Sequence, residues 1–172
     1  MKPEELKAAQ APLKNRYKAA PESAMVTLKA AGRLGEGVSC KVQTGKALVE
    51  AGLHAATGGT GLLACSGDML LEALAACAGV TLSAVATSLG IVVRGGTANA
   101  EGDLDFRGTL GVSKDVPVGF QRIRVSFALD TDASEEELAT LRRLTERYCV
   151  VFQTLARPAE MSLRLKGSTP QK

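Results

Sequence analysis

The sequence predicts a single domain of the α+β class, with antiparallel sheets, one long central helix and a second, capped helix. Residues 68–88 repeat apolar side chains at the three- and four-residue spacing of one helical face. Residues 98–106 and 122–129 alternate apolar and polar side chains, as half-buried strands do. The order of strands, long helix, strands, capped helix and strand favours α+β over an alternating βαβ fold.

Composition narrows the possible functions. The 172 residues are 45% hydrophobic and 23% charged, which is ordinary for a globular domain with a sizeable core. A net charge of +3 and an aromatic content of 3% disfavour nucleic-acid binding through a basic, aromatic-lined groove. The first ten residues contain acidic side chains and no apolar signal core, so we expect a cytoplasmic protein. In that reducing compartment its four cysteines are expected to be free or catalytic.

The central helix carries Cys77 at the middle of its apolar face. Ser66 is the expected N-cap, Asp68 lies in the first turn where the helix dipole favours an anion, and Gly90 is the expected stop. Residues 73–93 contain no charge and are long enough to span a bilayer, but their small polar residues and charged flanks favour a buried core helix. The expected core-facing residues are Leu70, Ala73, Leu74, Cys77, Val80, Thr81 and Ala84.

The N-terminal part is predicted to hold an arm and three strands. Residues 1–20 form a polar helical arm, and residues 21–172 form the domain. Strands are expected at residues 25–30, 38–42 and 46–51, with a Gly-rich turn at residues 32–37. The loop that follows contains His54, the only histidine, and its spacing from Cys65 and Cys77 does not fit a zinc site. We therefore expect neither a metal nor a cofactor.

The two alternating segments after the central helix carry opposite charges on their polar faces. Glu101 and Asp103 lie on the first, and Arg122 and Arg124 on the second. Opposite charges on facing residues stabilise neighbouring strands by roughly 0.2–1 kcal/mol per pair. The sequence therefore predicts that these two strands are antiparallel neighbours.

The C-terminal part begins with a capping box, in which Ser134 is the N-cap and Glu137 is the third helical residue. The helix that it opens is expected to run to Cys149–Val151. Residues 161–165 alternate Met, Leu and Leu with polar residues and are predicted to form the last strand.

Two segments carry a resemblance to a known family. Residues 66–77, SGDMLLEALAAC, resemble the P-x-E/D-L-L-x-A-L-A-A-C helix of the osmotically inducible and organic hydroperoxide resistance (OsmC/Ohr) proteins. Residues 148–155, YCVVFQTL, resemble that family's C-P-V segment. The resemblance covers roughly residues 25–166 and is nearest to the OsmC-like branch. It implies the OsmC-like α+β fold and an intertwined homodimer with active sites at the subunit interface.

The resemblance also implies a thiol peroxidase that reduces organic hydroperoxides. Cys77 would be the peroxidatic thiolate and Cys149 the resolving thiol; the two lie 72 positions apart, and the sequence gives no other reason for them to meet. Arg33, which matches a G-R context of the hydroperoxide branch, would stabilise the thiolate, and Asp68 matches the acidic position of the OsmC-like branch. An external dithiol of the lipoyl-protein or thioredoxin type would restore the thiols.

Two departures and several alternatives bear on this hypothesis. Val150 and Ser66 replace two family prolines, and Val150 leads us to expect slower disulfide formation. A buried cysteine is commonly inert packing, and Arg33 is equally well an exposed turn residue. The alternative functions are a non-catalytic dimeric stress protein and a binding module for a small apolar ligand at the subunit interface.

Overall fold

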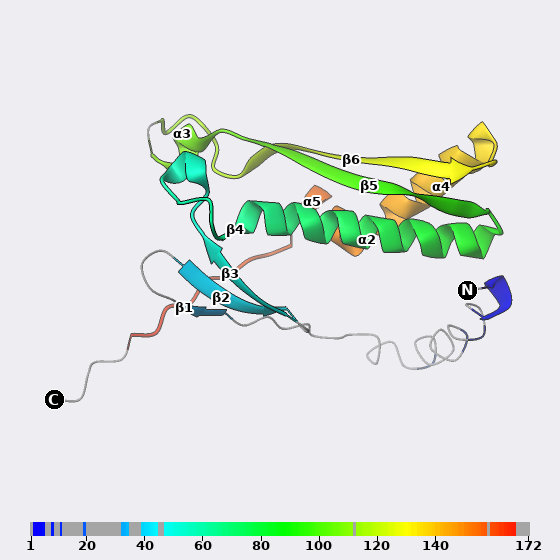
Figure 1. The fold of residues 1–172 in the computed structure, drawn as a ribbon, viewed down its shortest axis with the longest axis horizontal. Helices are drawn as coiled ribbons and strands as arrows, with labels where there is room; N and C mark the ends of the chain where they lie inside the picture. The colour runs from blue at the N-terminus through cyan, green and yellow to red at the C-terminus, as the bar shows by residue number, and fades with distance from the viewer. Residues whose placement is uncertain are drawn as a thin grey trace.

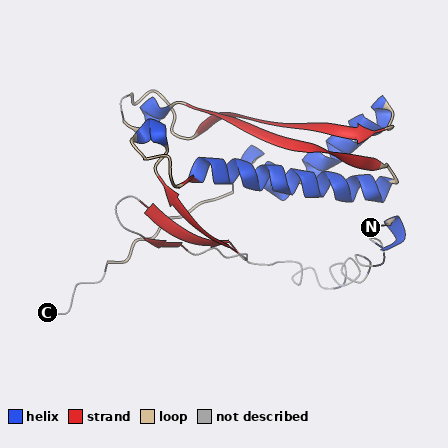
Figure 2. Cartoon of the chain, in the orientation of Figure 1, coloured by secondary structure: helices blue, strands red, loops and turns tan. Residues whose placement is uncertain are grey.

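The computed structural model describes residues 2–5, 8, 11, 19, 32–34, 39–44, 47–111, 113–157 and 159–167, and among residues 32–47 it describes the backbone alone. The strand predicted at residues 25–30 and most of the predicted arm lie outside the described residues. The described chain is α+β: a four-stranded sheet, a long hairpin, a central helix and two shorter helices behind it (Figures 1 and 2).

The N-terminal sheet has the strand order β1-β2-β3-β4. Its strands are β1 (Gly32–Leu34), β2 (Ser39–Thr44), β3 (Ala47–Gly52) and β4 (Ala64–Cys65). The first three are antiparallel neighbours, and β4 runs parallel to β3. Two predicted strands are thus confirmed as β2 and β3. Arg33 lies in β1 opposite Lys41, so its placement in a turn was wrong.

Helix α2 (Ser66–Leu89) confirms the predicted central helix. It ends at Gly90, whose φ of 73° is in the left-handed region that glycine adopts without a Cβ penalty. The predicted N-cap was wrong by one residue: Cys65 has the extended backbone of the N-cap and makes no side-chain capping bond, while Ser66 is already helical. Asp68 lies in the first turn, as predicted.

The buried face of α2 differs from the predicted stripe. Leu74, Ala78, Leu82 and Ala86 are the buried residues, at an exact spacing of four. Of the predicted stripe only Leu74 is buried, and Val80 is 72% exposed. Because α2 is apolar around most of its circumference, periodicity alone does not select its core side. The helix is long and apolar enough to cross a membrane, and 28% of its most apolar stretch is buried within the chain.

Strands β5 (Val93–Leu104) and β6 (Phe120–Thr131) form a long antiparallel hairpin that packs on α2 (Figure 1). Its register places Glu101 opposite Arg124 and Asp103 opposite Arg122, which confirms the predicted pairing of opposite charges. Arg124 Nη2 donates to Asp103 Oδ1 at 2.8 Å. The connection between the strands includes a helical turn, α3 (Phe106–Thr109), so Phe106 is not the strand residue that its alternation predicted.

Two helices follow the hairpin. Helix α4 (Glu135–Tyr148) begins with the predicted capping box: Ser134 Oγ accepts from Glu137 N, and the Glu137 carboxylate accepts from Ser134 N. The predicted continuous helix through residue 151 was wrong, because Cys149 is extended and α5 (Val150–Ala156) begins after it.

Residues 159–167 do not form the predicted last strand. Three apolar side chains that alternate along this segment are 87–90% exposed: Met161, Leu163 and Leu165. A single strand without a neighbour leaves its backbone groups unpaired, so alternation by itself does not make a strand.

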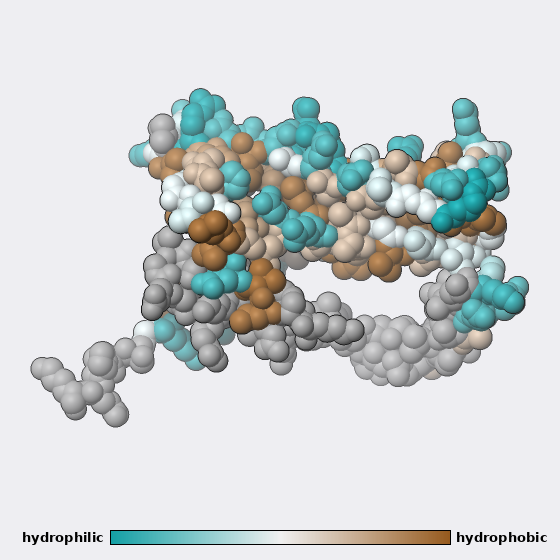
Figure 3. Space-filling view, viewed as in Figure 1, coloured by the Kyte–Doolittle hydropathy of each residue, from teal (hydrophilic) through white to brown (hydrophobic). Residues whose placement is uncertain are grey.

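The described core lies between α2, the hairpin and the C-terminal helices. One cluster joins Leu82, Ala86 and Leu141 to the inner face of β6, and a second joins Leu74, Ala78 and Cys149 to α5. Figure 3 shows hydrophilic surface along the upper, hairpin side and mostly apolar or neutral surface along the band of α2. The polar side of the hairpin therefore faces outward while its apolar side covers α2.

Candidate active site

Cys77 lies near the middle of α2 and is half-buried. Its neighbours along the helix include Ala76 and Ala78, whose small side chains leave room for another element to approach. The thiol packs against the cluster of Leu74, Ala78 and Cys149. Helix α2 therefore fixes the first thiol where the C-terminal helices meet it.

Cys149 occupies the corner between α4 and α5 and is 1% exposed. Its N–H donates to the Thr145 carbonyl at 2.9 Å, and its carbonyl accepts from Gln153 N at 2.9 Å. One residue thus ends α4 and begins α5 with both backbone groups satisfied. This arrangement aims the start of α5 at the middle of α2.

The fold brings Cys77 and Cys149 together although they lie 72 positions apart in the sequence. Both are free thiols, and each is close enough to shift the pKa of the other. Two thiols in contact are the arrangement needed for reversible disulfide formation. This part of the predicted site is therefore assembled within one chain.

The surroundings of the two thiols shift their pKa values in opposite directions. Burial raises the pKa of Cys77, but hydrogen bonds from the Val151 N–H, the Cys149 thiol, the Thr81 hydroxyl and the Val150 N–H outweigh it, so that pKa lies below its ordinary value. Burial, followed by the neighbouring Cys77 sulfur, raises the pKa of Cys149. Cys77 is therefore the thiol that ionises first.

The donors around Cys77 were not predicted from the sequence. Thr81 lies four residues after Cys77, so helical spacing places its hydroxyl beside the thiol. This spacing could have identified Thr81 from the sequence. The amides of Val150 and Val151 carry no such signal, because only the packing of α5 on α2 brings them there.

Two other predicted site residues lie elsewhere in the described chain. Asp68 is exposed in the first turn of α2, nine residues before Cys77, which is about 13 Å along a helix and on its opposite side. The backbone of Arg33 is in β1, and its side chain is outside the described atoms. Their roles at the thiols stay predictions. Cys65, at the start of α2, is a further free cysteine.

A family model and several solved structures match this chain. Residues 59–164 match the family model described as OsmC-like protein. No curated protein matches the sequence. Among solved structures, an OsmC-like protein from Mycoplasma pneumoniae aligns with a TM-score of 0.65 and 17% identity, over 77% of this chain and 89% of that one.

Two further solved structures are named for organic hydroperoxide resistance. The protein from Elizabethkingia anophelis, with bound thiocyanate, aligns with a TM-score of 0.61 and 17% identity over 78% of this chain and 90% of its own. A putative one from Vibrio cholerae, with captopril in one of its active sites, aligns with a TM-score of 0.54 and 14% identity over 78% and 88%. At these identities the likeness establishes the fold.

Proposed function

Because this chain belongs to the OsmC-like protein family, we propose that it is a thiol-dependent peroxidase that reduces organic hydroperoxides. The observation that carries the proposal is the contact between Cys77 and Cys149, both as free thiols. The lowered pKa of Cys77 supports its role as the attacking thiolate, and burial of Cys149 suits a thiol that reacts second.

The proposed reaction has three steps. The Cys77 thiolate attacks the terminal peroxide oxygen, the O–O bond breaks, and the departing alkoxide takes a proton and leaves as an alcohol. Cys77 is now a sulfenic acid; the Cys149 sulfur attacks it, and the hydroxyl leaves with the Cys149 proton as water. An external dithiol then reduces the disulfide by exchange and is itself oxidised.

The donors around Cys77 suit the first step. A thiolate is the nucleophile, and the Val150 and Val151 amides with the Thr81 hydroxyl stabilise its charge. We include Arg33 as a further cationic group at the thiolate and Asp68 as an acidic member of the site, on the family resemblance. Because Asp68 is distant from Cys77 within one chain, its role would require a site completed by a second copy.

The proposal includes partners and a compartment. We propose a homodimer, an organic hydroperoxide as substrate and a reductant of the lipoyl-protein or thioredoxin type, acting in the reducing cytoplasm. The exposed apolar side of α2 supports the dimer, because a helix this apolar is stabilised when a second subunit buries the face that its own chain leaves exposed.

The test is a stoichiometric reaction with cumene hydroperoxide and no reductant. One equivalent should consume two thiols, and peptide mapping should find Cys77 joined to Cys149. Cys77→Ser should abolish peroxide consumption, whereas Cys149→Ser should consume one equivalent and leave Cys77 as a sulfenic acid. Cys65→Ser, which alters a free cysteine outside this pair, is the matched control and should react like the unmodified protein.

If both thiols remain titratable after excess peroxide, the peroxidase proposal fails. The alternatives then separate by ligand binding: a binding module would take up a small apolar molecule at the subunit interface, and a purely structural stress protein would not.

A further inference from the structure

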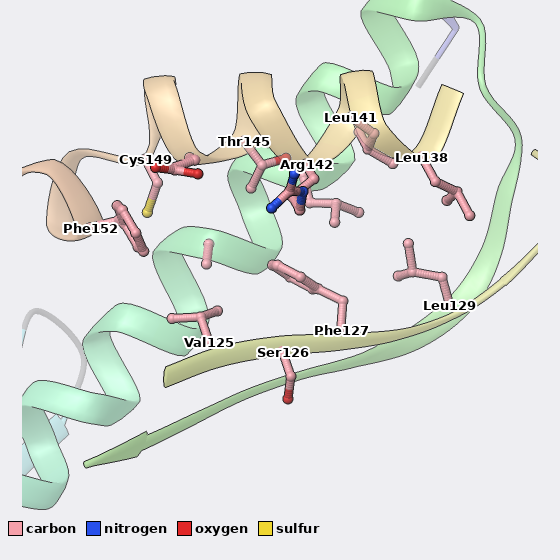
Figure 4. Close-up of a pocket in the computed structure, with 13 residues that line it drawn as sticks. Val125, Ser126, Phe127, Leu129, Leu138, Leu141, Arg142, Thr145, Cys149 and Phe152 are labelled. Atoms are coloured by element: carbon pink, nitrogen blue, oxygen red, sulfur yellow. The ribbon is translucent and has the colours of Figure 1, made fainter. Parts of the chain in front are cut away.

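A cavity of about 510 Å³ lies between α2, β6 and α4 (Figure 4). Cys149 lines it but Cys77 does not, so the cavity is separate from the proposed peroxidatic thiol. Its volume is within the range of small-molecule sites. The apolar part of its wall includes Leu82, Val125, Phe127, Leu129, Leu141 and Phe152.

Helix α4 contributes three polar side chains to this wall: Arg142, Thr145 and Glu146. Arg142 is exposed on the helix, lies between α4 and β6 in Figure 4, and has no hydrogen bond or ion pair to any residue in the described part of the chain. Thr145 is 4% exposed, and its buried Oγ1 likewise has no hydrogen-bond partner there. A buried hydroxyl without a partner destabilises a protein, so a polar group supplied by a ligand would relieve that cost.

Arg142 and Thr145 are three residues apart, which places them side by side on one face of α4. A guanidinium binds a carboxylate through two parallel hydrogen bonds, and a hydroxyl donates a third. Glu146 also lines the cavity, so one cationic and one anionic side chain border it. The Glu146 carboxylate favours a cationic ligand, whereas the unpaired Arg142 guanidinium, which can only donate, favours an anion, to which the Thr145 hydroxyl can also donate.

We propose that this cavity binds a small apolar carboxylic acid, with its hydrocarbon chain among the apolar side chains and its carboxylate on Arg142 and Thr145. A neutral apolar molecule would leave both polar groups unpaired. A phosphate would bring a more strongly hydrated charge to a mostly apolar wall. The proposal does not depend on peroxidase activity, because neither polar residue touches Cys77.

The first test is calorimetric titration of the full-length reduced protein with decanoic acid. We expect saturable binding of one molecule per chain, weakened by salt, and weaker binding of 1-decanol. Arg142→Ala should weaken decanoate binding by about two- to fivefold, since an exposed ion pair contributes modestly. Arg143→Ala, on the same helix but outside the cavity, is the matched control and should bind as before.

The second test locates the ligand. The sequence contains no tryptophan, so Leu138→Trp places a single tryptophan at a cavity-lining residue that is 36% exposed. Decanoate should change the emission of the tryptophan at position 138. It should not change the emission of Tyr148→Trp, because residue 148 lies on α4 outside the cavity. Thr145→Val, which keeps the side-chain shape without the hydroxyl, should weaken binding without lowering the melting temperature.

Four results would overturn the proposal. They are an absence of saturable decanoate binding, equal losses in Arg142→Ala and Arg143→Ala, tighter binding of decylamine than of decanoate, and a fluorescence response confined to Tyr148→Trp. The decanoate measurements use no peroxide and no cysteine variant. The peroxidase proposal can therefore fail without changing their outcome.

Discussion

Val150 bears directly on the thiol chemistry, because its backbone N–H is one of the donors to the Cys77 sulfur. The OsmC/Ohr motif has a proline at this place, and a proline has no N–H to donate. The substitution therefore has two opposite consequences. It adds a donor that stabilises the thiolate, and it removes a ring that would stiffen the backbone beside Cys149.

Val150→Pro tests the donor. Loss of the N–H should raise the pKa of Cys77, so at neutral pH a smaller fraction is thiolate and alkylation by iodoacetamide slows. The pH at which alkylation is half-maximal should move upward. Proline is tolerated at the first residue of a helix, so α5 should persist. Val150→Ala keeps the amide and should alkylate at the original rate; an equal slowing in both variants would contradict the role of the N–H.

Arg33→Ala tests the proposed cationic contribution. If Arg33 supports the thiolate, the variant should raise the pKa of Cys77 and slow its alkylation at neutral pH. Arg94→Ala serves as the control, since Arg94 is held by Asp130 and Asp132 at 2.6 and 2.5 Å. Unchanged alkylation of Arg33→Ala would leave the backbone and hydroxyl donors as the means of activation. Arg147, which lies over the Tyr148 ring, would then be tested next.

At the scale of elements, α2 organises the described core through one face. Leu74, Ala78, Leu82 and Ala86 pack against the hairpin, α4 and α5, while the opposite side holds Ala73, Ala76 and Val80. The same helix carries Cys77 at the edge between these two sides. Packing of its buried face therefore determines where the thiol lies relative to Cys149.

Leu74→Ala should test this dependence. Removal of a fully buried leucine side chain leaves a cavity and should lower the free energy of unfolding by about 2–5 kcal/mol. Leu70→Ala, one turn earlier and 37% exposed, is the matched control and should cost clearly less. Urea denaturation followed by circular dichroism measures both; equal losses would mean that the buried face has been misassigned.

At the scale of the whole molecule, two apolar surfaces have no cover within the described chain. One is the outer side of α2, and the other is the alternating segment of Met161, Leu163 and Leu165. Exposed apolar surfaces of this kind mark protein–protein contacts. Both are accounted for by the proposed homodimer, in which a second copy covers α2 and supplies a neighbour for residues 161–165.

Sedimentation should give about twice the chain mass of 17.9 kDa. Val80→Asp places a charge on the outer side of α2 and should shift the protein toward the monomer, because an unpaired buried charge is strongly unfavourable at an interface. Val118→Asp is the matched control: Val118 is 73% exposed, against 72% for Val80, but lies in the connection between β5 and β6. A monomer at micromolar concentration in the unmodified protein would contradict the dimer.

The sequence by itself determined the features that depend on neighbours along the chain. The capping box of Ser134 and Glu137, the stop at Gly90 and the alternation in β5 and β6 follow from contacts within a few residues, and the opposite charges predicted which strands pair. Family resemblance, rather than any local rule, indicated that Cys77 and Cys149 belong together.

Only the tertiary structure decided which side of α2 is buried, that Cys149 is a corner between two helices, and that residues 161–165 find no strand within the described chain. It also placed the Val150 and Val151 amides at Cys77 and left Arg142 and Thr145 unpaired beside a cavity. The physical reason is the same in each case. A helix that is apolar all round, or a strand without a neighbour, has its environment set by what packs against it, and those contacts join residues far apart in the sequence.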